Sequence, residues 1–365
     1  MTKKLIAVLF AIFVMAGGIF AQTLEISGEM KTGLFWEKVE ATDEPVWERT
    51  RMHNNDDAGG NEGRFRMNLH LTKDTIGMKV RFEQTAWTAT QPNLWAFAFA
   101  YGNFLDEQLR IVVGRLGESP WSAGGPDIWQ ELDSQIGIRT EIKPGAIPGL
   151  NVGFVLNGWD QSNYYPEKNT LGDLLMETVF GISYTGDYFH GRFCYRLDGE
   201  SDIYNGQSEG TSLMYRLEER ALKNKVDGLS IWANGWWSGM GTEDVDIILF
   251  RNWFYVQLAP KQFTSQLRVG YHHGNKLQEL HTRLSFYYNI TDQLSLGAAG
   301  NFRMDFGENS VKDVPYKLWN VEPQIKMIFA PGTYVSLVYQ YEYEPLDPVK
   351  YKQTQRINLR TVFTF

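Results

Sequence analysis

The chain has 365 residues and a formal net charge of −8, from 43 acidic and 35 basic residues. An acidic balance of this kind argues against a nucleic-acid-binding protein, which needs a basic surface for phosphate contacts. The single cysteine, Cys194, excludes an internal disulfide framework. Aromatic residues are abundant, with 12 Trp, 18 Tyr and 22 Phe, whereas no apolar run beyond the first residues is long enough for a membrane-spanning helix.

The first 21 residues have the layout of a secretory signal peptide. Two lysines precede an apolar run over residues 5–15, and small residues follow at Gly17, Gly18 and Ala21. The alternative is a retained N-terminal membrane anchor. The small residues favour cleavage after Ala21, so we expect an exported chain that begins at residue 22.

From there the chain repeats segments of about ten residues in which apolar and polar side chains alternate. In segment 63–72, apolar residues at 65, 67, 69 and 71 alternate with polar residues at 64, 66, 68 and 70. Such alternation predicts β-strands with two chemically different faces. Further copies occupy residues 78–85, 134–143, 189–198, 263–272, 280–290, 294–304, 335–343 and 356–365.

The connections alternate in length along the chain. Short turns are expected at 73–77, 144–149, 185–187, 259–260, 291–293 and 330–333, and the longer polar loops include 40–62, 116–133, 160–176, 199–210, 306–316 and 344–354. Short turns at one end and long loops at the other are typical of outer-membrane barrels. We therefore predict one all-β domain over residues 22–365, a closed antiparallel transmembrane β-barrel of about 18 strands, with 16 as the alternative. Segments 211–222, 245–258 and 317–329 are ambiguous.

A soluble β-sandwich would show the same alternation, with its apolar face in a core. Three features favour a bilayer instead: segments of about ten residues, aromatic residues at strand ends, and an apolar last segment that must pair with the first strand to close the sheet. The aromatic residues expected at headgroup depth are Trp36, Trp87, Trp159, Trp236, Trp253, Tyr184, Tyr271 and Tyr288.

In a barrel the arginines must line the interior, because one arginine facing lipid near the midplane costs about 2–4 kcal/mol. The pore-lining candidates are Arg64, Arg66, Arg81, Arg139, Arg192, Arg196, Arg268, Arg283, Arg303, Arg356 and Arg360, and Arg110 falls on the same face. The inward acidic residues are expected to be fewer, namely Glu83, Glu141, Asp198 and Asp305.

The last segment, RINLRTVFTF, carries apolar residues at Ile357, Leu359, Phe363 and Phe365, with Thr361 interrupting the alternation. It resembles the C-terminal insertion signal of outer-membrane barrels, which ends in an aromatic residue. The resemblance to Gram-negative-type outer-membrane porins covers the mature chain in architecture and rests on no specific residue motif. It implies recognition by the barrel assembly machinery, a place in the outer membrane in contact with its lipid, and a possible homotrimer.

Residues 116–133 form the third long connection, and in porins the third such loop often folds into the barrel. It carries Glu118, Asp127, Glu131 and Asp133 together with Trp121 and Trp129. An acidic loop opposite an arginine wall would place a transverse field across a constriction. The alternative is an ordinary surface loop. The two tryptophans could stack on sugars, or they could pack down and anchor the loop.

Metal and enzyme signals are weak. His272, His273 and His281 lie close in sequence, but no cysteine or carboxylate completes a set at the usual ligand spacing, so no metal site and no cofactor are expected. No GxSxG, HExxH or Gly-rich phosphate loop occurs, and we expect no enzyme. Outer-membrane lipases and proteases, which scatter their catalytic residues over the barrel wall, are the enzymatic alternative.

The predicted function is a passive diffusion channel for small hydrophilic solutes, among them ions, sugars or anions. The arginines predict a mild preference for anions at the wall, which the acidic loop could cancel. A surface-exposed adhesin, or a structural envelope barrel without significant conductance, is the alternative function.

Overall fold

The structure is a computed structural model that describes residues 23–42, 44–52, 64–84, 97–117, 119–121, 136–157, 178–196, 211–223, 225–240, 249–274, 278–306, 316–345 and 350–365. The predicted signal peptide, residues 1–21, lies outside these ranges. None of the described residues form a helix that is long and apolar enough to cross a membrane.

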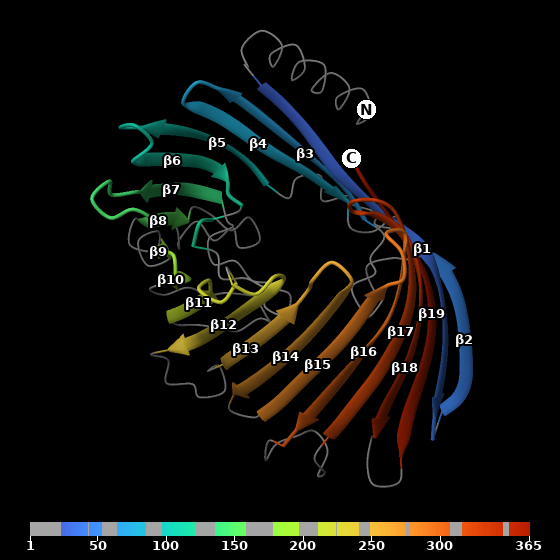
Figure 1. Cartoon of the computed structure of the whole chain (residues 1–365). Helices are drawn as coiled ribbons and strands as arrows, with labels where there is room; N and C mark the ends of the chain where they lie inside the picture. Colours follow the sequence, from blue (N-terminus) through green and yellow to red (C-terminus); the bar gives the residue numbers. More distant parts are fainter. Residues whose placement is uncertain are drawn as a thin grey trace, which may run out of the picture.

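The described residues form nineteen β-strands that follow one another along the chain (Figure 1). They are β1 (Thr23–Ala41), β2 (Glu44–Met52), β3 (Arg64–Lys73), β4 (Ile76–Gln84), β5 (Phe97–Phe104), β6 (Leu109–Arg115), β7 (Ile136–Ile142), β8 (Leu150–Asn157), β9 (Val179–Thr185), β10 (Phe189–Arg196), β11 (Thr211–Glu219), β12 (Leu229–Met240), β13 (Leu249–Leu258), β14 (Phe263–Gly274), β15 (Gln278–Asn289), β16 (Leu294–Asp305), β17 (Tyr316–Ala330), β18 (Thr333–Pro345) and β19 (Tyr351–Thr364).

The strands close into an antiparallel barrel. From β3 to β19 each strand pairs with the next, and β19 returns to pair with β1 in a register that runs from Glu29 opposite Thr364 to Ala41 opposite Lys352. Closure matters in a bilayer because an open edge would leave backbone groups without partners in hydrocarbon. The closed antiparallel barrel predicted from the sequence is therefore confirmed.

Strands β2 and β3 occupy a single place in the ring. The first part of β1 pairs with β3, from Thr23 opposite Thr72 to Lys31 opposite Arg64. Its second part pairs with β2, from Leu34 opposite Met52 to Ala41 opposite Glu44. Nineteen strands thus fill eighteen places, which agrees with the expected number. Within the described residues, each of the three ambiguous segments contains a strand, β11, β13 and β17 respectively.

The two ends of the barrel differ, as predicted. At the short-turn end, turns such as 74–75, 186–188 and 331–332 join neighbouring strands. At the opposite, long-loop end, the connections include 116–135 and 158–178. Two expected loops are wrong in extent. In the expected loop 40–62, β1 runs to Ala41 and β2 fills Glu44–Met52, and in the expected loop 344–354, β19 already begins at Tyr351.

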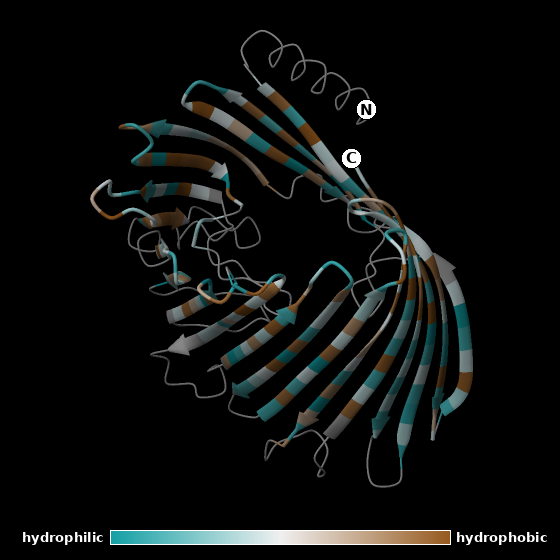
Figure 2. Cartoon of the chain, in the orientation of Figure 1, coloured by the Kyte–Doolittle hydropathy of each residue, from teal (hydrophilic) through white to brown (hydrophobic). Residues whose placement is uncertain are grey.

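The outer face carries a belt of exposed apolar side chains. Leu284 is 61% exposed, and its neighbours on the same face of β15, Phe286 and Tyr288, are 50% and 46% exposed. Figure 2 shows the resulting alternation of hydrophobic and hydrophilic residues along the strands. Apolar area of this extent, repeated around a closed sheet, matches a lipid-facing surface.

The end of the chain completes the closure at the short-turn end of the barrel. Gly28 and Phe365 exchange backbone hydrogen bonds of 2.8 and 3.1 Å. The Phe365 ring covers Gly28, and a Cβ atom added at Gly28 would overlap that ring. The apolar residues of the predicted insertion signal, Ile357, Leu359, Phe363 and Phe365, are exposed on the outer face.

Candidate functional site

The face opposite the apolar belt, here called the inner face, carries the arginines. Ile138 is 43% exposed whereas the next residue, Arg139, is 2% exposed, as expected when successive side chains of a strand point to opposite sides. The eleven candidate arginines and Arg110 all fall on inner-face positions of the strand register.

Half of the twelve inner-face candidate arginines are paired with a glutamate on the same strand or on a strand one or two places away in the barrel. The clearest example is Glu37 of β1, which is 3% exposed and accepts hydrogen bonds from Arg356 of β19 at 2.8 Å and from Arg49 of β2 at 2.7 Å. Further pairs are Arg64–Glu29, Arg66–Glu83, Arg139–Glu141, Arg216–Glu218, Arg283–Glu322 and Arg303–Glu279.

This pairing corrects the expected excess of inner-face arginines over acids. Glu29, Glu37, Glu218, Glu279 and Glu322 were missed: Glu218 and Glu322 lie in ambiguous segments, and the other three lie outside the segments in which alternation was recognised. Asp198 lies outside the described residues. Much of the arginine charge is therefore balanced locally. Within the described residues, Arg110 and Arg360 have no carboxylate at ion-pair distance, and Arg110 lies 4.1 Å from the centre of the Tyr101 ring.

One part of the inner face is apolar rather than charged. Side chains from β5 to β13 form a buried cluster together with Leu116 and Trp121 of the loop after β6: Phe97, Phe99, Val112, Val155, Val179, Cys194, Met214, Trp236, Trp253 and Tyr255. Trp236 and Trp253 were expected at headgroup depth, and this is wrong: they are 1% and 7% exposed and pack inside the barrel. Two-sided apolar strands such as β6 and β8 were the available signal, because an apolar inner face needs a packing partner.

Trp121 is that partner. Its side chain is fully buried and lies against Gly181 of β9 and Gly153 of β8. A Cβ atom at either glycine would overlap the indole, so glycine at both positions gives the ring its place on the wall. A ring buried in this way has no face left for stacking on a sugar.

Polar contacts hold the same segment. The Cys194 thiol donates a hydrogen bond to the Trp121 carbonyl at 3.1 Å, and Arg139 Nη1 donates to the Gly117 carbonyl at 3.4 Å. Within the segment, the Trp121 N–H donates to Ser119 Oγ at 3.0 Å. Residues 116–121, apart from Glu118, therefore pack on the inner face. Glu118, Asp127, Trp129, Glu131 and Asp133 lie outside the described residues.

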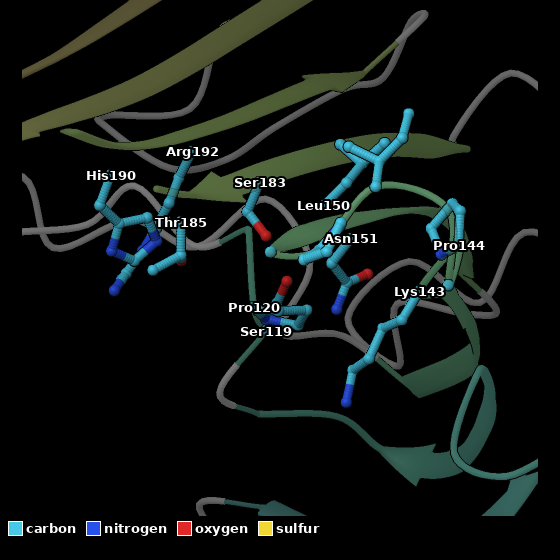
Figure 3. Close-up of a pocket in the computed structure, with 14 residues that line it drawn as sticks. Ser119, Pro120, Lys143, Pro144, Leu150, Asn151, Ser183, Thr185, His190 and Arg192 are labelled. Atoms are coloured by element: carbon cyan, nitrogen blue, oxygen red, sulfur yellow. The ribbon is translucent and has the colours of Figure 1, made fainter. Parts of the chain in front are cut away.

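A cavity of about 540 Å³ lies next to this segment (Figure 3). Ser119 and Pro120 line one side, and the other sides come from the β7–β8 turn and the neighbouring parts of β8, β9 and β10. Its polar lining includes Lys143, Asn151, Ser183, Thr185, His190 and Arg192. These parts of β8, β9 and β10 adjoin the short-turn end. The loop that leaves β6 at the long-loop end therefore reaches the opposite half of the barrel.

The three histidines lie in the part of the wall near the long-loop end, and they fall on the faces that the alternation predicts. His272 and His281 fall on the inner face and His273 on the outer face. The expectation that no carboxylate accompanies them is wrong, because Glu279 faces His272 across the β14–β15 pair and bonds to His281 at 2.9 Å. One residue separates Glu279 from His281 in sequence, a spacing that places both on one face of a strand.

Comparisons with known proteins agree with this architecture. No protein-family model matches the chain and no curated protein matches it. Among solved structures, Pseudomonas aeruginosa OpdQ is similar with a TM-score of 0.54 at 12% identity, over 95% of this chain and 99% of that one. The anion-selective porin from Comamonas acidovorans gives 0.53 at 10% identity, over 93% and 99%. The outer membrane channel DcaP of Acinetobacter baumannii gives 0.53 at 9% identity, over 94% and 97%.

The chain has the fold of an outer-membrane porin. The likeness extends over nearly the whole length of both chains, so the porin fold accounts for the closed ring and not only for a group of strands. At these identities the likeness concerns the fold, and the inner-face residues of this porin fold must be argued from their own contacts.

Proposed function

We propose that this porin-fold chain forms a passive diffusion channel for small hydrophilic solutes, with a mild preference for anions. One observation carries the proposal: the segment that leaves β6 at the long-loop end packs through Trp121 against Gly153 and Gly181 and lines a cavity near the short-turn end. A segment held there would narrow the interior, which is the arrangement that a selective, water-filled channel needs.

The polar wall opposite the apolar cluster supports the same function. Its inner-face side chains on β17 to β19 include Gln324, Glu342 and Arg360, which are partly exposed, whereas the Glu37–Arg356 pair beside them is buried. Such groups can exchange hydrogen bonds with a solute that sheds part of its hydration shell. No cofactor or energy source is needed, and the solute moves down its gradient.

The preference for anions rests on where the basic groups lie. Lys143, His190 and Arg192 line the cavity, and within its described lining no carboxylate accompanies them. Positive groups around a confined aqueous space attract anions and repel cations. The predicted acidic residues of the loop would oppose this preference, so we expect it to be mild.

Liposome swelling tests the channel directly. Purified, folded protein in vesicles should allow small neutral sugars to enter at a rate that falls steeply with solute size. Heat-unfolded protein in the same vesicles is the control and should give no swelling. If folded, inserted protein gives no entry of the smallest sugars, a structural or adhesive barrel becomes the better account.

A further inference from the structure

Two histidines and a glutamate form a compact cluster on the inner face near the long-loop end. His272 is in β14, and Glu279 and His281 are in β15, with His272 directly opposite Glu279 in the register. Glu279 Oε2 lies 2.9 Å from His281 Nε2 and 3.6 Å from His272 Nδ1. One ligand atom from each of the three residues lies within 4.8 Å of the others.

These distances suit a shared metal ion. With metal–ligand bonds of about 2.1 Å, two ligands of a tetrahedral ion lie about 3.4 Å apart. The two measured separations from Glu279 Oε2 fall on either side of this value. Shifts of a few tenths of an ångström, well within the range of side-chain rotation, would place all three atoms around one ion.

The surroundings hold the ligands in place. Trp253 packs edge-on against both imidazoles, with ring centroids 5.3 Å from His272 and 5.5 Å from His281. Arg303 bonds to Glu279 through Oε1, which leaves Oε2 on the side of the two imidazoles. A second residue that orients a ligating carboxylate in this way is usual in metal sites. His272 and Glu279 are 6% and 3% exposed, whereas His281 is less buried and is the side from which an ion can enter.

We propose that His272, Glu279 and His281 bind a divalent transition metal ion of the Zn²⁺ class in the wall of the barrel. Two imidazoles and one carboxylate are a ligand set for Zn²⁺, Ni²⁺ or Cu²⁺, whereas Ca²⁺ and Mg²⁺ require more oxygen ligands. Three protein ligands leave a fourth position for water or a solute carboxylate. A bound ion adds positive charge to the interior near the long-loop end, and so increases the preference for anions.

The competing account is a hydrogen-bonded cluster without affinity for metal. In that account a protonated imidazole and Arg303 share the Glu279 carboxylate, and the added positive charge of a metal would be repelled. Arg303 separates the two accounts, because replacing it with a neutral residue removes a positive charge beside the ligands. A metal site should then bind Zn²⁺ more tightly, provided that the carboxylate keeps its orientation.

Calorimetric titration of ZnCl₂ into folded protein in detergent tests the proposal. The protein should carry no histidine tag, and metal should be removed beforehand with a chelator. We expect one ion per chain, a Kd in the micromolar range, and at least a tenfold loss of affinity in both His281→Ala and Glu279→Gln. Retained strand content and retained resistance to unfolding in detergent would show that each variant is folded.

His273→Ala is the matched control. The His273 imidazole is next to His272 in β14 but on the outer face, where it stacks on Tyr271. This variant should bind Zn²⁺ as the unchanged protein does, and Arg303→Gln should bind it at least as well. The proposal is overturned if the folded protein binds no Zn²⁺ below millimolar concentration, or if His273→Ala loses affinity while His281→Ala retains it. Because calorimetry requires no conductance, this result is independent of the proposed channel function.

Discussion

The indole of Trp121 occupies the space that a side chain at position 181 would fill, because Gly181 presents only its backbone to the ring. The loop after β6 is thereby fixed to the wall formed by β8 and β9. Trp121→Ala should cost about 3–5 kcal/mol of the free energy that anchors the segment. Because the barrel itself stays closed, we expect a folded protein with a higher single-channel conductance and more current noise.

Gly181→Leu provides an independent check on the same contact. This substitution lies outside the loop, and its leucine side chain would displace the indole from the wall. It should therefore raise the single-channel conductance, as Trp121→Ala does. A Gly191→Ala variant is the control, since Gly191 is on the outer face of β10 and contacts no part of the loop that the structure describes. Unchanged conductance in both test variants would show that the segment does not narrow the channel.

Glu37 of β1 links its strand to the two strands on either side of it, by accepting hydrogen bonds from Arg356 of β19 and Arg49 of β2. Glu37→Gln should lower the free energy of unfolding by about 3 kcal/mol, because it leaves the largely buried Arg356 guanidinium, and the half-exposed Arg49 guanidinium beside it, without their shared carboxylate. Urea unfolding in lipid vesicles, followed by tryptophan fluorescence, measures this change.

Glu25→Gln on the same strand is the control for that measurement. Glu25 pairs with His70 at 3.3 Å, but its side chain is 70% exposed, and an exposed pair contributes only about 0–1 kcal/mol. Equal losses in the two variants would mean that Glu37 has no special part in closing the barrel.

If the outer belt faces lipid, an arginine placed in it should destabilise the protein by an amount that depends on its depth in the bilayer. Leu284 is near the middle of β15 and Tyr288 is near its short-turn end. Leu284→Arg should destabilise the folded protein in vesicles by about 2–4 kcal/mol, and Tyr288→Arg by about 0–1 kcal/mol. The difference in unfolding free energy between these two variants is the informative quantity. If both substitutions are harmless, the exposed face is not in contact with lipid.

The cavity predicts where ion selectivity arises. Lys143→Glu and Arg192→Glu each reverse one charge in its lining, so both should shift the reversal potential in a salt gradient toward cation preference. Lys261→Glu is the matched control, because Lys261 is an exposed turn residue at the same end of the barrel. A shift of the same size in the control would place the effect in surface charge rather than in the cavity.

Alternation was sufficient to predict many of the strands and their two faces: segments 63–72 and 280–290 show it clearly, and β3 and β15 lie there. The closed barrel, rather than a sandwich, was predicted only with the length of the segments, the aromatic residues and the apolar last segment. The extent of the first hairpin could not be predicted in this way. Residues 44–52 show no clean alternation, because charged residues fall on both faces of β2, Glu48 on one and Arg49, which pairs with Glu37, on the other. Such a strand resembles a loop in sequence.

The interior was harder to predict because its contacts join distant parts of the chain. Nothing near Trp121 in the sequence indicates Gly153, Gly181 or Cys194, although the apolar inner positions of β6 and β8 indicated that something must cover them. The ion pairs were hidden for a similar reason: Glu37 and Arg356 are 319 residues apart and meet only after the ring closes.

Planar-bilayer recording of the unchanged protein tests the central claim most directly. Single insertions should give discrete current steps with a linear current–voltage relation, and a salt gradient should give a reversal potential of the sign expected for mild anion preference. Protein that is folded and inserted, as shown by its resistance to added protease, and yet passes no current at any voltage would contradict the account.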